Sequence, residues 1–454
     1  MPIERRNHPQ EVLTVDFLVL GGGMAGMTAG GRAAAAGLRV LVVEKGPEIG
    51  GSALLSGGKL WTAKSAELFA QETPGGDPAL QRAMLDMFDT SVDWLRSTGI
   101  DVADVSYHLH YGKGYDFDLI AYFEHCRMLV EKAGGWIVRD AVADRLIVED
   151  GRVTGAVISD RDGDTIVHSD WTLLATGGFS ANPQLLECFV NRNAAKALAR
   201  SNPYSTGDGL RLGVEAGGSI SPLMKGFYGH VIQSPVHKWG PREFRAYTQG
   251  GSIRSILINR SGLRFCDESL GDHQNAQRIL EQPGATILIV FDEGVRRAEA
   301  QTILANTSTP IDKVQIAIDE GAHVAAADNW AELFEKTRAW GFDAETAIET
   351  VADYNRQAMA TEPPTPPRIR SLQPYLEPPF YAIEGQAGVT ATHGGLRVDT
   401  VARVLNAFGE PIPGLLAAGA DAGNVHGEGY AGGLCFAATF ALLAARHVIG
   451  ERPG

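Results

Sequence analysis

A strand, a glycine-rich turn and a helix near the start of the chain constrain the fold more than any other feature. The apolar run at 15–20 predicts a short strand, and three glycines follow it in the spacing GxGxxG. An alanine-rich helix is expected up to about residue 38, before a second strand that ends at Glu44. In this arrangement Gly21 permits the tight turn, Gly23 lets a pyrophosphate approach the backbone, and Gly26 packs the helix against the strand.

The acidic residue that ends the second strand supports a dinucleotide site. Glu44 stands 18 residues after the last glycine of the turn, where a carboxylate can accept hydrogen bonds from an adenosine ribose. No second fingerprint for a nicotinamide dinucleotide follows, since the segment TGDGLRLG at 206–213 lacks the third glycine. The segment GPEIGGSALLSGGKLW after Glu44 is dense in small residues that suit a chain running along a flavin ribityl group. The sequence therefore predicts bound FAD.

Composition and charge exclude several other classes of protein. The chain has 40 basic and 54 acidic residues, and a net charge of −14 repels phosphate backbones, so nucleic-acid binding is not expected. No apolar run reaches the roughly 18 residues of a membrane span, and the first residues lack the apolar core of an export signal, so a cytoplasmic location is expected. The four cysteines stand far apart without CxxC spacing, and no metal site is predicted.

The glycine content of the sequence changes twice along the chain. Glycine-rich segments typical of dinucleotide-binding proteins precede residue 222 and return after residue 351, whereas short strands mix with helices between them. We predict an α/β fold in which a Rossmann-type FAD-binding domain, 1–221 and 352–454, is interrupted by an inserted α+β capping domain, 222–351. Helical periodicity is clear at 80–95 and 119–130, and turn residues at 149–151 predict a hairpin.

Seven ordered motifs resemble one family of flavoproteins. They are VDFLVLGGGMAG, VVEKG, GGSALLSGG, LLATGGF, TGDGLRLG, GGLRVD and PIPGLLAAGAD. In order and spacing they are similar to the flavoprotein family of fumarate reductases and succinate dehydrogenases, which includes the 3-ketosteroid dehydrogenases and tricarballylate dehydrogenase. The resemblance implies an FAD domain with an inserted cap, a substrate held between the cap and the flavin, and interconversion of C–C single and double bonds next to an activating group.

The resemblance also implies which residues contact FAD. The positions that match the family's contacts are Gly21, Gly23, Gly26, Glu44, Gly51, Ser52, Ser56, Gly57, Gly58, Val142, Ala175, Thr176, Gly177, Asp208, Gly419, Asp421, Leu434 and Cys435. Succinate dehydrogenases attach flavin to a histidine in the loop after the acidic ribose ligand. This chain has no histidine between His8 and His108, so the FAD is expected to be non-covalent.

The substrate-binding positions of the fumarate reductases are not kept. Their carboxylate-binding histidine falls on Ala391, their catalytic arginine on Gly251, and their second carboxylate-binding arginine on Tyr430. The loss of all three groups argues against fumarate or succinate chemistry. Tyr430 instead begins the segment YAGG, which is similar to the YPGAG of the 3-ketosteroid dehydrogenases, where the tyrosine hydroxyl and a nearby backbone N–H polarise a ketone.

The physical chemistry of these side chains suits the same reaction. A phenol is protonated at neutral pH and can donate to a carbonyl oxygen, which acidifies the neighbouring C–H bond. Tyr430 is therefore the predicted polarising group, and His393, His230 and Arg254 on the SIRSILIN strand are the candidates for proton transfer or substrate orientation. The base stays open at this point.

Four other polar residues are weaker candidates for a role in the reaction. The ketosteroid members place a tyrosine soon after the segment RFxNE, but here RFCDESLGDHQ offers only Asp272 and His273. His426 and Glu428 are expected to be ordinary loop residues.

The sequence thus predicts an FAD-dependent dehydrogenase or reductase that acts on a C–C bond α,β to a carbonyl in a small or cyclic, ketone-like substrate. An external electron donor or acceptor is the expected partner, because no second nucleotide site is found. One alternative is a tricarballylate dehydrogenase-like polycarboxylate oxidoreductase, which RFCDE supports by its similarity to RFVDE in that branch. Another is a flavin-holding electron-transfer subunit without substrate chemistry.

Overall fold

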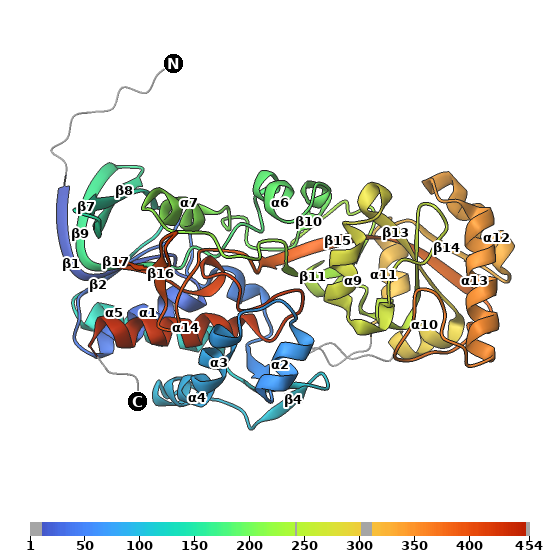
Figure 1. Cartoon of the computed structure of the whole chain (residues 1–454), viewed down its shortest axis with the longest axis horizontal. Helices are drawn as coiled ribbons and strands as arrows, with labels where there is room; N and C mark the ends of the chain where they lie inside the picture. The colour runs from blue at the N-terminus through green and yellow to red at the C-terminus, as the bar shows by residue number, and fades with distance from the viewer. Residues whose placement is uncertain (1–10, 241–242, 301–310, 451–454) are drawn as a thin grey trace, which may run out of the picture. The chain divides into compact units, whose positions relative to one another are not determined.

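The computed structural model describes residues 11–240, 243–300 and 311–450, which form two compact units (Figure 1). Unit 1 consists of the described residues of Met1–Asn182, Ser201–Gly226 and Ala391–Gly454, and unit 2 of those of Pro183–Arg200 and Phe227–Thr390.

Unit 1 is built on a mostly parallel sheet in the order β16-β17-β9-β1-β2-β6, with β7 and β8 joined to β9 as a hairpin. The strands of this sheet are β1 (Glu11–Leu20), β2 (Val40–Val43), β6 (Trp136–Val138), β7 (Val142–Glu149), β8 (Arg152–Asp160), β9 (Gly163–Leu174), β16 (Arg403–Leu405) and β17 (Pro411–Ala417). In the parallel pairs Leu18 lies opposite both Leu41 and Thr172. The central strands are apolar and buried, as a parallel sheet covered on both faces requires.

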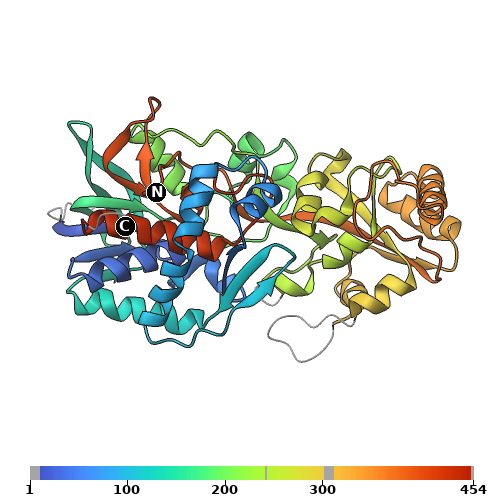
Figure 2. The same cartoon turned by 60° about the horizontal axis from the view of Figure 1, so that its bottom comes forward.

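Three helices of unit 1 lie side by side along the sheet, as Figures 1 and 2 show. α1 (Met24–Ala35) packs against both α5 (Leu119–Lys132) and α14 (Gly433–Val448). Small residues allow this close packing: a Cβ added at Gly31 of α1 would lie 3.0 Å from the sulfur of Cys126 on α5. The remaining elements of unit 1 are β3 (Lys59–Ala63), β4 (Ser106–His108), β5 (Gly112–Asp116), α2 (Ala66–Glu72), α3 (Pro78–Asp86), α4 (Phe88–Ser97), α7 (Asp208–Glu215) and the 3-10 turns η1 (Gly51–Leu55) and η7 (Gly419–Asp421).

Local predictions for unit 1 agree with the structure in most places. The predicted hairpin turn is confirmed, since Asp150 and Gly151, with φ of 49° and 76°, connect β7 to β8. The periodic segment at 80–95 forms two helices, α3 and α4, which meet at Met87. Periodicity continues across this junction because both helices bury one face, so the pattern alone does not show the break.

Unit 2 is organised around β15 (Phe380–Thr392), which pairs with four other strands. Those strands are β10 (Leu198–Ala199), β11 (Phe227–Gln233), β13 (Thr286–Phe291) and β14 (Val324–Ala327), while β12 (Ile256–Asn259) pairs with β13. The helices are α6 (Pro183–Phe189), α8 (Glu243–Ala246), α9 (Asp272–Ile279), α10 (Glu293–Ala300), α11 (Lys313–Asp319), α12 (Trp330–Thr337) and α13 (Ala344–Met359). The 3-10 turns are η2 (Ala194–Lys196), η3 (Gly250–Arg254), η4 (Glu268–Leu270), η5 (Pro283–Ala285) and η6 (Arg338–Trp340).

The unit boundaries differ from the predicted domain boundaries at 221 and 351. Residues 352–390 belong to unit 2 because β15 pairs with β13 and β14, and residues 183–200 join them because β10 pairs with β15. Composition alone does not reveal this difference, because long-range strand pairing leaves no trace in the glycine content of a segment.

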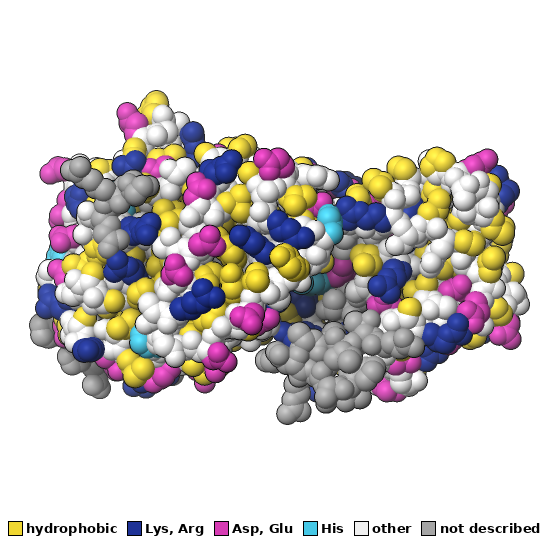
Figure 3. Space-filling view, turned by 90° about the horizontal axis from the view of Figure 1, so that it is seen from below, with side chains coloured by type: hydrophobic (Ala, Val, Ile, Leu, Met, Phe, Trp, Pro, Cys, Tyr) yellow, Lys and Arg dark blue, Asp and Glu magenta, His cyan; other side chains and the backbone are white. Residues whose placement is uncertain are grey.

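Three further observations concern the surface charges, the helices and the side chains that could bind a metal. On the face shown in Figure 3, lysine and arginine side chains are interspersed with aspartate and glutamate. Within the described ranges, no helix combines the length and the apolar character needed to cross a bilayer. In the same ranges, no three or more histidine, cysteine, aspartate or glutamate side chains are grouped so as to hold a metal ion.

Candidate functional site

The turn between β1 and α1 has the backbone of a dinucleotide cradle. Gly21 has a φ of 111°, and a Cβ added there would lie 2.1 Å from the carbonyl oxygen of Ala175. A Cβ at Gly26 would lie 1.8 Å from the carbonyl oxygen of Gly21, so only glycine fits at either position. Gly23 differs, since the nearest atom to an added Cβ is the carbonyl oxygen of Gly50 at 3.9 Å. The turn therefore has no room for a side chain at Gly21 or Gly26, whereas the backbone at Gly23 is open.

The polar groups around this turn fit a bound dinucleotide. The Glu44 carboxylate is buried and accepts hydrogen bonds from the backbone N–H of Gly22 at 2.7 Å and of Gly46 at 2.6 Å. No side chain caps the N-terminus of α1, and its first turn holds no acidic residue. The first N–H groups of α1 are thus suited to phosphate oxygens, while the remaining lone pairs of Glu44 suit ribose hydroxyls. This donor and acceptor set matches FAD.

A second buried carboxylate ties together the other FAD-cradle segments. Asp421 in η7 accepts hydrogen bonds from the backbone N–H of Thr176 and of Gly178, the latter at 3.1 Å. Burial raises the pKa of Asp421 to about 6, and the two backbone N–H groups oppose that rise. The hydroxyl oxygen of Thr176 accepts from Gly209 N–H at 2.8 Å, which joins the end of β9 to the start of α7. Asp208, the first residue of α7, pairs with Lys45 at 2.9 Å.

The other predicted FAD contacts all lie in unit 1. Gly51 and Ser52 are in η1, Ser56, Gly57 and Gly58 follow it, Ala175 and Gly177 flank Thr176, Gly419 begins η7, and Leu434 and Cys435 are in the first turn of α14. Val142 begins β7 and is exposed. The residue before it, Ala141, was not predicted from the sequence to be part of the site. Its backbone N–H donates to the carbonyl oxygen of Glu44 at 3.1 Å.

Aromatic rings surround Tyr430 in unit 1. Its ring centroid lies 5.7 Å from that of Trp61, 5.4 Å from that of His426 and 6.3 Å from that of His393, to which it is nearly parallel. The Tyr111 hydroxyl donates to the carbonyl oxygen of Tyr430 at 2.6 Å. The ring of Tyr430 is thus fixed from several sides while the residue stays partly exposed.

The hydroxyl of Tyr430 lies at the start of the last helix. Its oxygen accepts a hydrogen bond from the backbone N–H of Gly433 at 2.7 Å, and Gly433 is the first residue of α14, a helix of 16 residues. The N-terminus of a helix carries a partial positive charge, which favours negative charge on nearby oxygen atoms. A phenol that accepts one hydrogen bond still carries a proton that it can donate.

The two histidines of this cluster have different surroundings. His393 is buried, and its Nδ1 donates to the carbonyl oxygen of Gly427 at 2.9 Å, which leaves Nε2 as the acceptor in the neutral ring. His426 is buried as well and packs against Phe69 and Phe436. The sequence had suggested only a loop residue at 426, because the aromatic partners come from distant segments.

Glu428 completes the loop that leads to Tyr430. Its carboxylate pairs with the exposed Lys225 at 2.6 Å, and the Glu428 side chain itself is partly exposed. The pair agrees with the structural role expected for Glu428.

The predicted catalytic residues of unit 2 also have defined partners. Arg254 lies in η3 rather than on a strand, because the SIRSILIN segment enters β12 only at Ile256, and it pairs with Glu299 at 3.1 Å with about half of its side chain exposed. His230 lies on β11, where its Nδ1 is 2.5 Å from Asp272 and its Nε2 is 2.8 Å from the hydroxyl of Tyr228. Sequence reasoning missed Tyr228, although alternation along a strand places residues 228 and 230 on one face.

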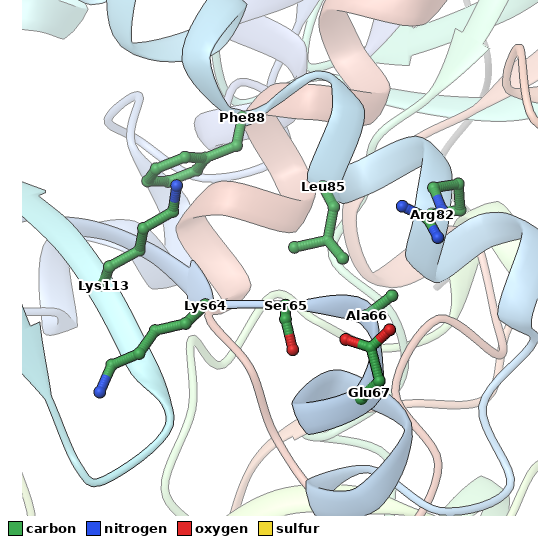
Figure 4. A pocket seen from close by; sticks show the side chains of 8 residues that line it. All are labelled: Lys64, Ser65, Ala66, Glu67, Arg82, Leu85, Phe88 and Lys113. Carbon is green, nitrogen blue, oxygen red and sulfur yellow. The ribbon is translucent and has the colours of Figure 1, made fainter.

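A separate small pocket lies on unit 1 (Figure 4). It is lined by Lys64, Ser65, Ala66, Glu67, Arg82, Leu85, Phe88 and Lys113, and the amine of Lys113 lies 5.1 Å from the ring centroid of Phe88. None of these residues belongs to the FAD cradle or to the cluster around Tyr430, so the pocket does not contribute to the candidate site.

Comparison with known proteins supports the FAD cradle. The family described as FAD binding domain matches residues 16–435. Fumarate reductase (cytochrome) of Shewanella frigidimarina is 29% identical over 453 residues, covering 92% of this chain and 74% of its own. 4-Oxocyclohexanecarboxylate 2-dehydrogenase of Sinomonas cyclohexanicum is 25% identical over 567 residues, covering 97% of this chain and 94% of its own.

A solved structure shares the whole fold. The 3-ketosteroid-Δ4-(5α)-dehydrogenase from Rhodococcus jostii RHA1, in complex with 4-androstene-3,17-dione, matches with a TM-score of 0.77 at 20% identity, over 98% of each chain. The predicted α/β fold with a Rossmann-type FAD-binding domain is confirmed by this likeness and by the family match.

Proposed function

The chain belongs to the FAD binding domain family and is an FAD-dependent oxidoreductase that acts on carbon–carbon bonds, and we propose that the bond lies α,β to a carbonyl group of a small or cyclic substrate. One observation carries the proposal: the Tyr430 hydroxyl lies 2.7 Å from Gly433 N–H at the start of α14. A phenol beside the positive end of a helix stabilises the negative charge that develops on a carbonyl oxygen as the neighbouring C–H bond breaks.

The substrate positions support a carbonyl rather than two carboxylates. Ala391, Gly251 and Tyr430, which stand where the fumarate reductases hold their dicarboxylate, carry no charge at neutral pH. The two relatives named above act on different compounds by their names, a fumarate and a cyclic keto acid. A neutral, hydrogen-bonding group at Tyr430 suits the ketone of the second, whereas both carboxylates of fumarate would lack a charged partner at these three positions, and burying an unpaired carboxylate is costly.

The residues of the chain divide the work of this reaction. When bound, FAD accepts or supplies hydride at the carbon β to the carbonyl. Glu44, the turn at Gly23 and the N-terminus of α1 hold its ribose and pyrophosphate. Tyr430 orients and polarises the carbonyl, and His393, with Nδ1 held by Gly427, presents Nε2 as a hydrogen-bond acceptor. An external electron carrier completes the cycle.

The substitution Tyr430→Phe tests the proposal. It removes the hydroxyl while the ring keeps its contacts with Trp61 and His393. We expect the rate of anaerobic flavin bleaching by 4-oxocyclohexanecarboxylate to fall by about 10²-fold, because one donor to the developing oxyanion is lost. FAD content and substrate affinity should change little, because the lost bond strengthens only in the transition state.

The controls separate polarisation from general damage. Tyr115→Phe, on β5, serves as the matched variant and should bleach at the wild-type rate. Succinate and tricarballylate, tested in parallel, should bleach the wild-type flavin slowly. Fast bleaching by either acid, or an unchanged rate in Tyr430→Phe, would refute the carbonyl assignment. Acid precipitation should release all flavin as FAD, as expected for non-covalent binding.

A further inference from the structure

The small pocket of unit 1 lies where three segments of the chain meet. Residues 64–67 join β3 to α2, Arg82 and Leu85 belong to α3, Phe88 begins α4 directly after it, and Lys113 lies on β5. Lys113 comes close to residues 64–67 because β5 pairs with β3. The pocket therefore belongs wholly to unit 1, and its volume is about 250 Å³.

The volume of the pocket limits what it can hold. Pockets that bury drug-sized ligands usually measure about 300–1,000 Å³, and this pocket is smaller. A dinucleotide is larger than such ligands, so neither FAD nor a nicotinamide nucleotide fits. The pocket suits a molecule with only a few carbon atoms.

Apolar side chains form one wall of the pocket. α3 and α4 meet at Met87, so Leu85 and Phe88 lie on either side of this junction. Phe88 is buried, and Leu85 is partly exposed. In Figure 4 the side chain of Leu85 lies between those of Lys113 and Arg82. Carbon atoms of a ligand that cover this wall leave water, which favours binding.

Three cations line the pocket together with a single carboxylate, that of Glu67. In the part of the chain that the structure describes, none of Lys64, Arg82 and Lys113 forms an ion pair with a carboxylate. The amine of Lys64 donates to the carbonyl oxygen of His110 at 2.8 Å, and Figure 4 shows it pointing away from the other labelled side chains. The lining thus carries more positive than negative charge, although the whole chain has a net charge of −14.

The carboxylate of Glu67 acts mainly on one side of the pocket. Hydrogen bonds from its own backbone N–H and from the Ser65 hydroxyl lower the pKa of Glu67, and the charge of Arg82 lowers it further. Figure 4 shows Glu67 on the side of Arg82, with Lys113 on the opposite side. Lys113 is therefore the cation best placed to bind an anion.

The amine of Lys113 has hydrogen-bond donors to offer. It lies 5.1 Å from the ring centroid of Phe88, where the face of the ring attracts a cation but replaces no ion pair. An ammonium group has three N–H donors, and among the described residues none accepts a hydrogen bond from this one. A carboxylate forms the strong, charge-assisted hydrogen bonds that such a group can make.

We propose that the small pocket binds a small organic anion, a short-chain carboxylate whose acidic group pairs with Lys113 and whose carbon chain lies against Leu85 and Phe88. The site is separate from the FAD cradle and from Tyr430, and it does not depend on the proposed function. Both parts of the ligand contribute, because the charge matches Lys113 and the chain matches the apolar wall.

A ligand-observed NMR titration of the holoenzyme with hexanoate tests the site. We expect a Kd of about 1 mM, which needs less binding energy per atom than small ligands can reach. Two further probes separate the two contributions. 1-Hexanol keeps the chain without the charge, and inorganic phosphate keeps the charge without the chain, so each should bind about tenfold more weakly or worse.

Two pocket variants and one control test the location of the site. Lys113→Met removes the charge and keeps an apolar stem, so the Kd for hexanoate should rise by about tenfold or more. Leu85→Asp places a carboxylate in the pocket and should raise the Kd at least as much, which keeps the site testable if Lys113→Met folds poorly. Lys132→Met, at the end of α5, removes the same charge outside the pocket, and its Kd should stay within about twofold of the wild type.

The flavin distinguishes this pocket from the candidate site. Hexanoate should leave the visible absorption spectrum of the bound flavin unchanged, and Tyr430→Phe should bind hexanoate as the wild type does. Binding lost in Tyr430→Phe and kept in Lys113→Met would overturn the assignment, because the anion would then bind near Tyr430. Absence of binding to the wild type, unchanged affinity in both pocket variants, or binding of 1-hexanol or phosphate as tight as that of hexanoate would overturn it as well.

Discussion

The FAD cradle of unit 1 and the hydrogen-bonded triad of unit 2, formed by Tyr228, His230 and Asp272, are held together by different kinds of contact. In the cradle the decisive constraints come from backbone atoms, such as the carbonyl oxygen of Gly21, which lies 1.8 Å from the position that a Cβ at Gly26 would take. In the triad the decisive contacts are between side chains, from β11 and from the start of α9. A backbone contact within a short turn restricts the residue type to glycine, whereas a side-chain contact between distant elements leaves no fixed spacing in the sequence.

The comparison also separates two kinds of carboxylate with little solvent exposure. Asp421 in unit 1 is held by backbone N–H groups of Thr176 and Gly178, while Asp272 in unit 2 is held by a histidine as well as by a backbone N–H. The first carboxylate stabilises an arrangement of loops. The second has a titratable partner through which a proton can move. Buried acids therefore have to be interpreted from their partners and not from burial alone.

The largest effect is expected from Gly26→Ala. An added methyl group would lie 1.8 Å from the carbonyl oxygen of Gly21, so α1 has to move away from β1. Overpacking against the backbone should lower the free energy of unfolding by about 3 kcal/mol, the upper end of the usual range for such changes. Thermal unfolding and FAD content measure the result. A variant with the stability and the FAD content of the wild type would show that backbone contacts do not restrict this position of the cradle to glycine.

Gly23→Ala should lose FAD without losing the fold. Its added methyl group meets only the carbonyl oxygen of Gly50 at 3.9 Å, so the free energy of unfolding of the apoprotein should stay within about 1 kcal/mol of the wild type. The methyl group occupies the space through which a pyrophosphate approaches the backbone, so the Kd for FAD should rise by at least about tenfold. Isothermal titration with FAD measures this change, and wild-type affinity would show that the pyrophosphate does not pass Gly23.

The pH dependence of stability should reveal Asp421. Its pKa is raised from 3.8 to about 6 in the folded protein, so the protonated form is the one that folding favours. The resulting stabilisation is fully present below about pH 4 and is lost as the pH rises through about 6, a change of roughly 3 kcal/mol in the free energy of unfolding. Asp421→Asn lacks this titration, so its stability should fall less than that of the wild type between about pH 4 and about pH 8. Parallel profiles from denaturant titrations at fixed excess FAD would contradict the assignment.

The smallest effect is expected from Arg254→Gln. Arg254 is a candidate catalytic cation in the sequence, but its half-exposed guanidinium pairs with Glu299. The half-exposed guanidinium keeps this ion pair weak although Glu299 is only partly exposed, so stability should change by about 1 kcal/mol and flavin bleaching should stay within about threefold. A loss of tenfold or more in bleaching would return Arg254 to the catalytic residues and would weaken the contrast with the triad.

The sequence by itself determined the parts of this protein that depend on local backbone constraints. The spacing of Gly21, Gly23 and Gly26, with Glu44 at the end of the next strand, was enough to predict a dinucleotide site, and the small-residue segment after Glu44, without a second fingerprint, then indicated FAD. This prediction was possible because a tight turn, a helix start and a strand end lie within one short segment, so each constraint acts on neighbours in the chain.

Only the tertiary structure decided which residues share a site. His230 and Asp272 are 42 positions apart, and nothing in their spacing indicates that one ring nitrogen lies 2.5 Å from the carboxylate. The phenol of Tyr228 meets the same ring only because β11 is a strand, whose alternate side chains share a face. Side chains find such partners through strand pairing and helix packing over long separations, and those contacts exist only in the folded chain.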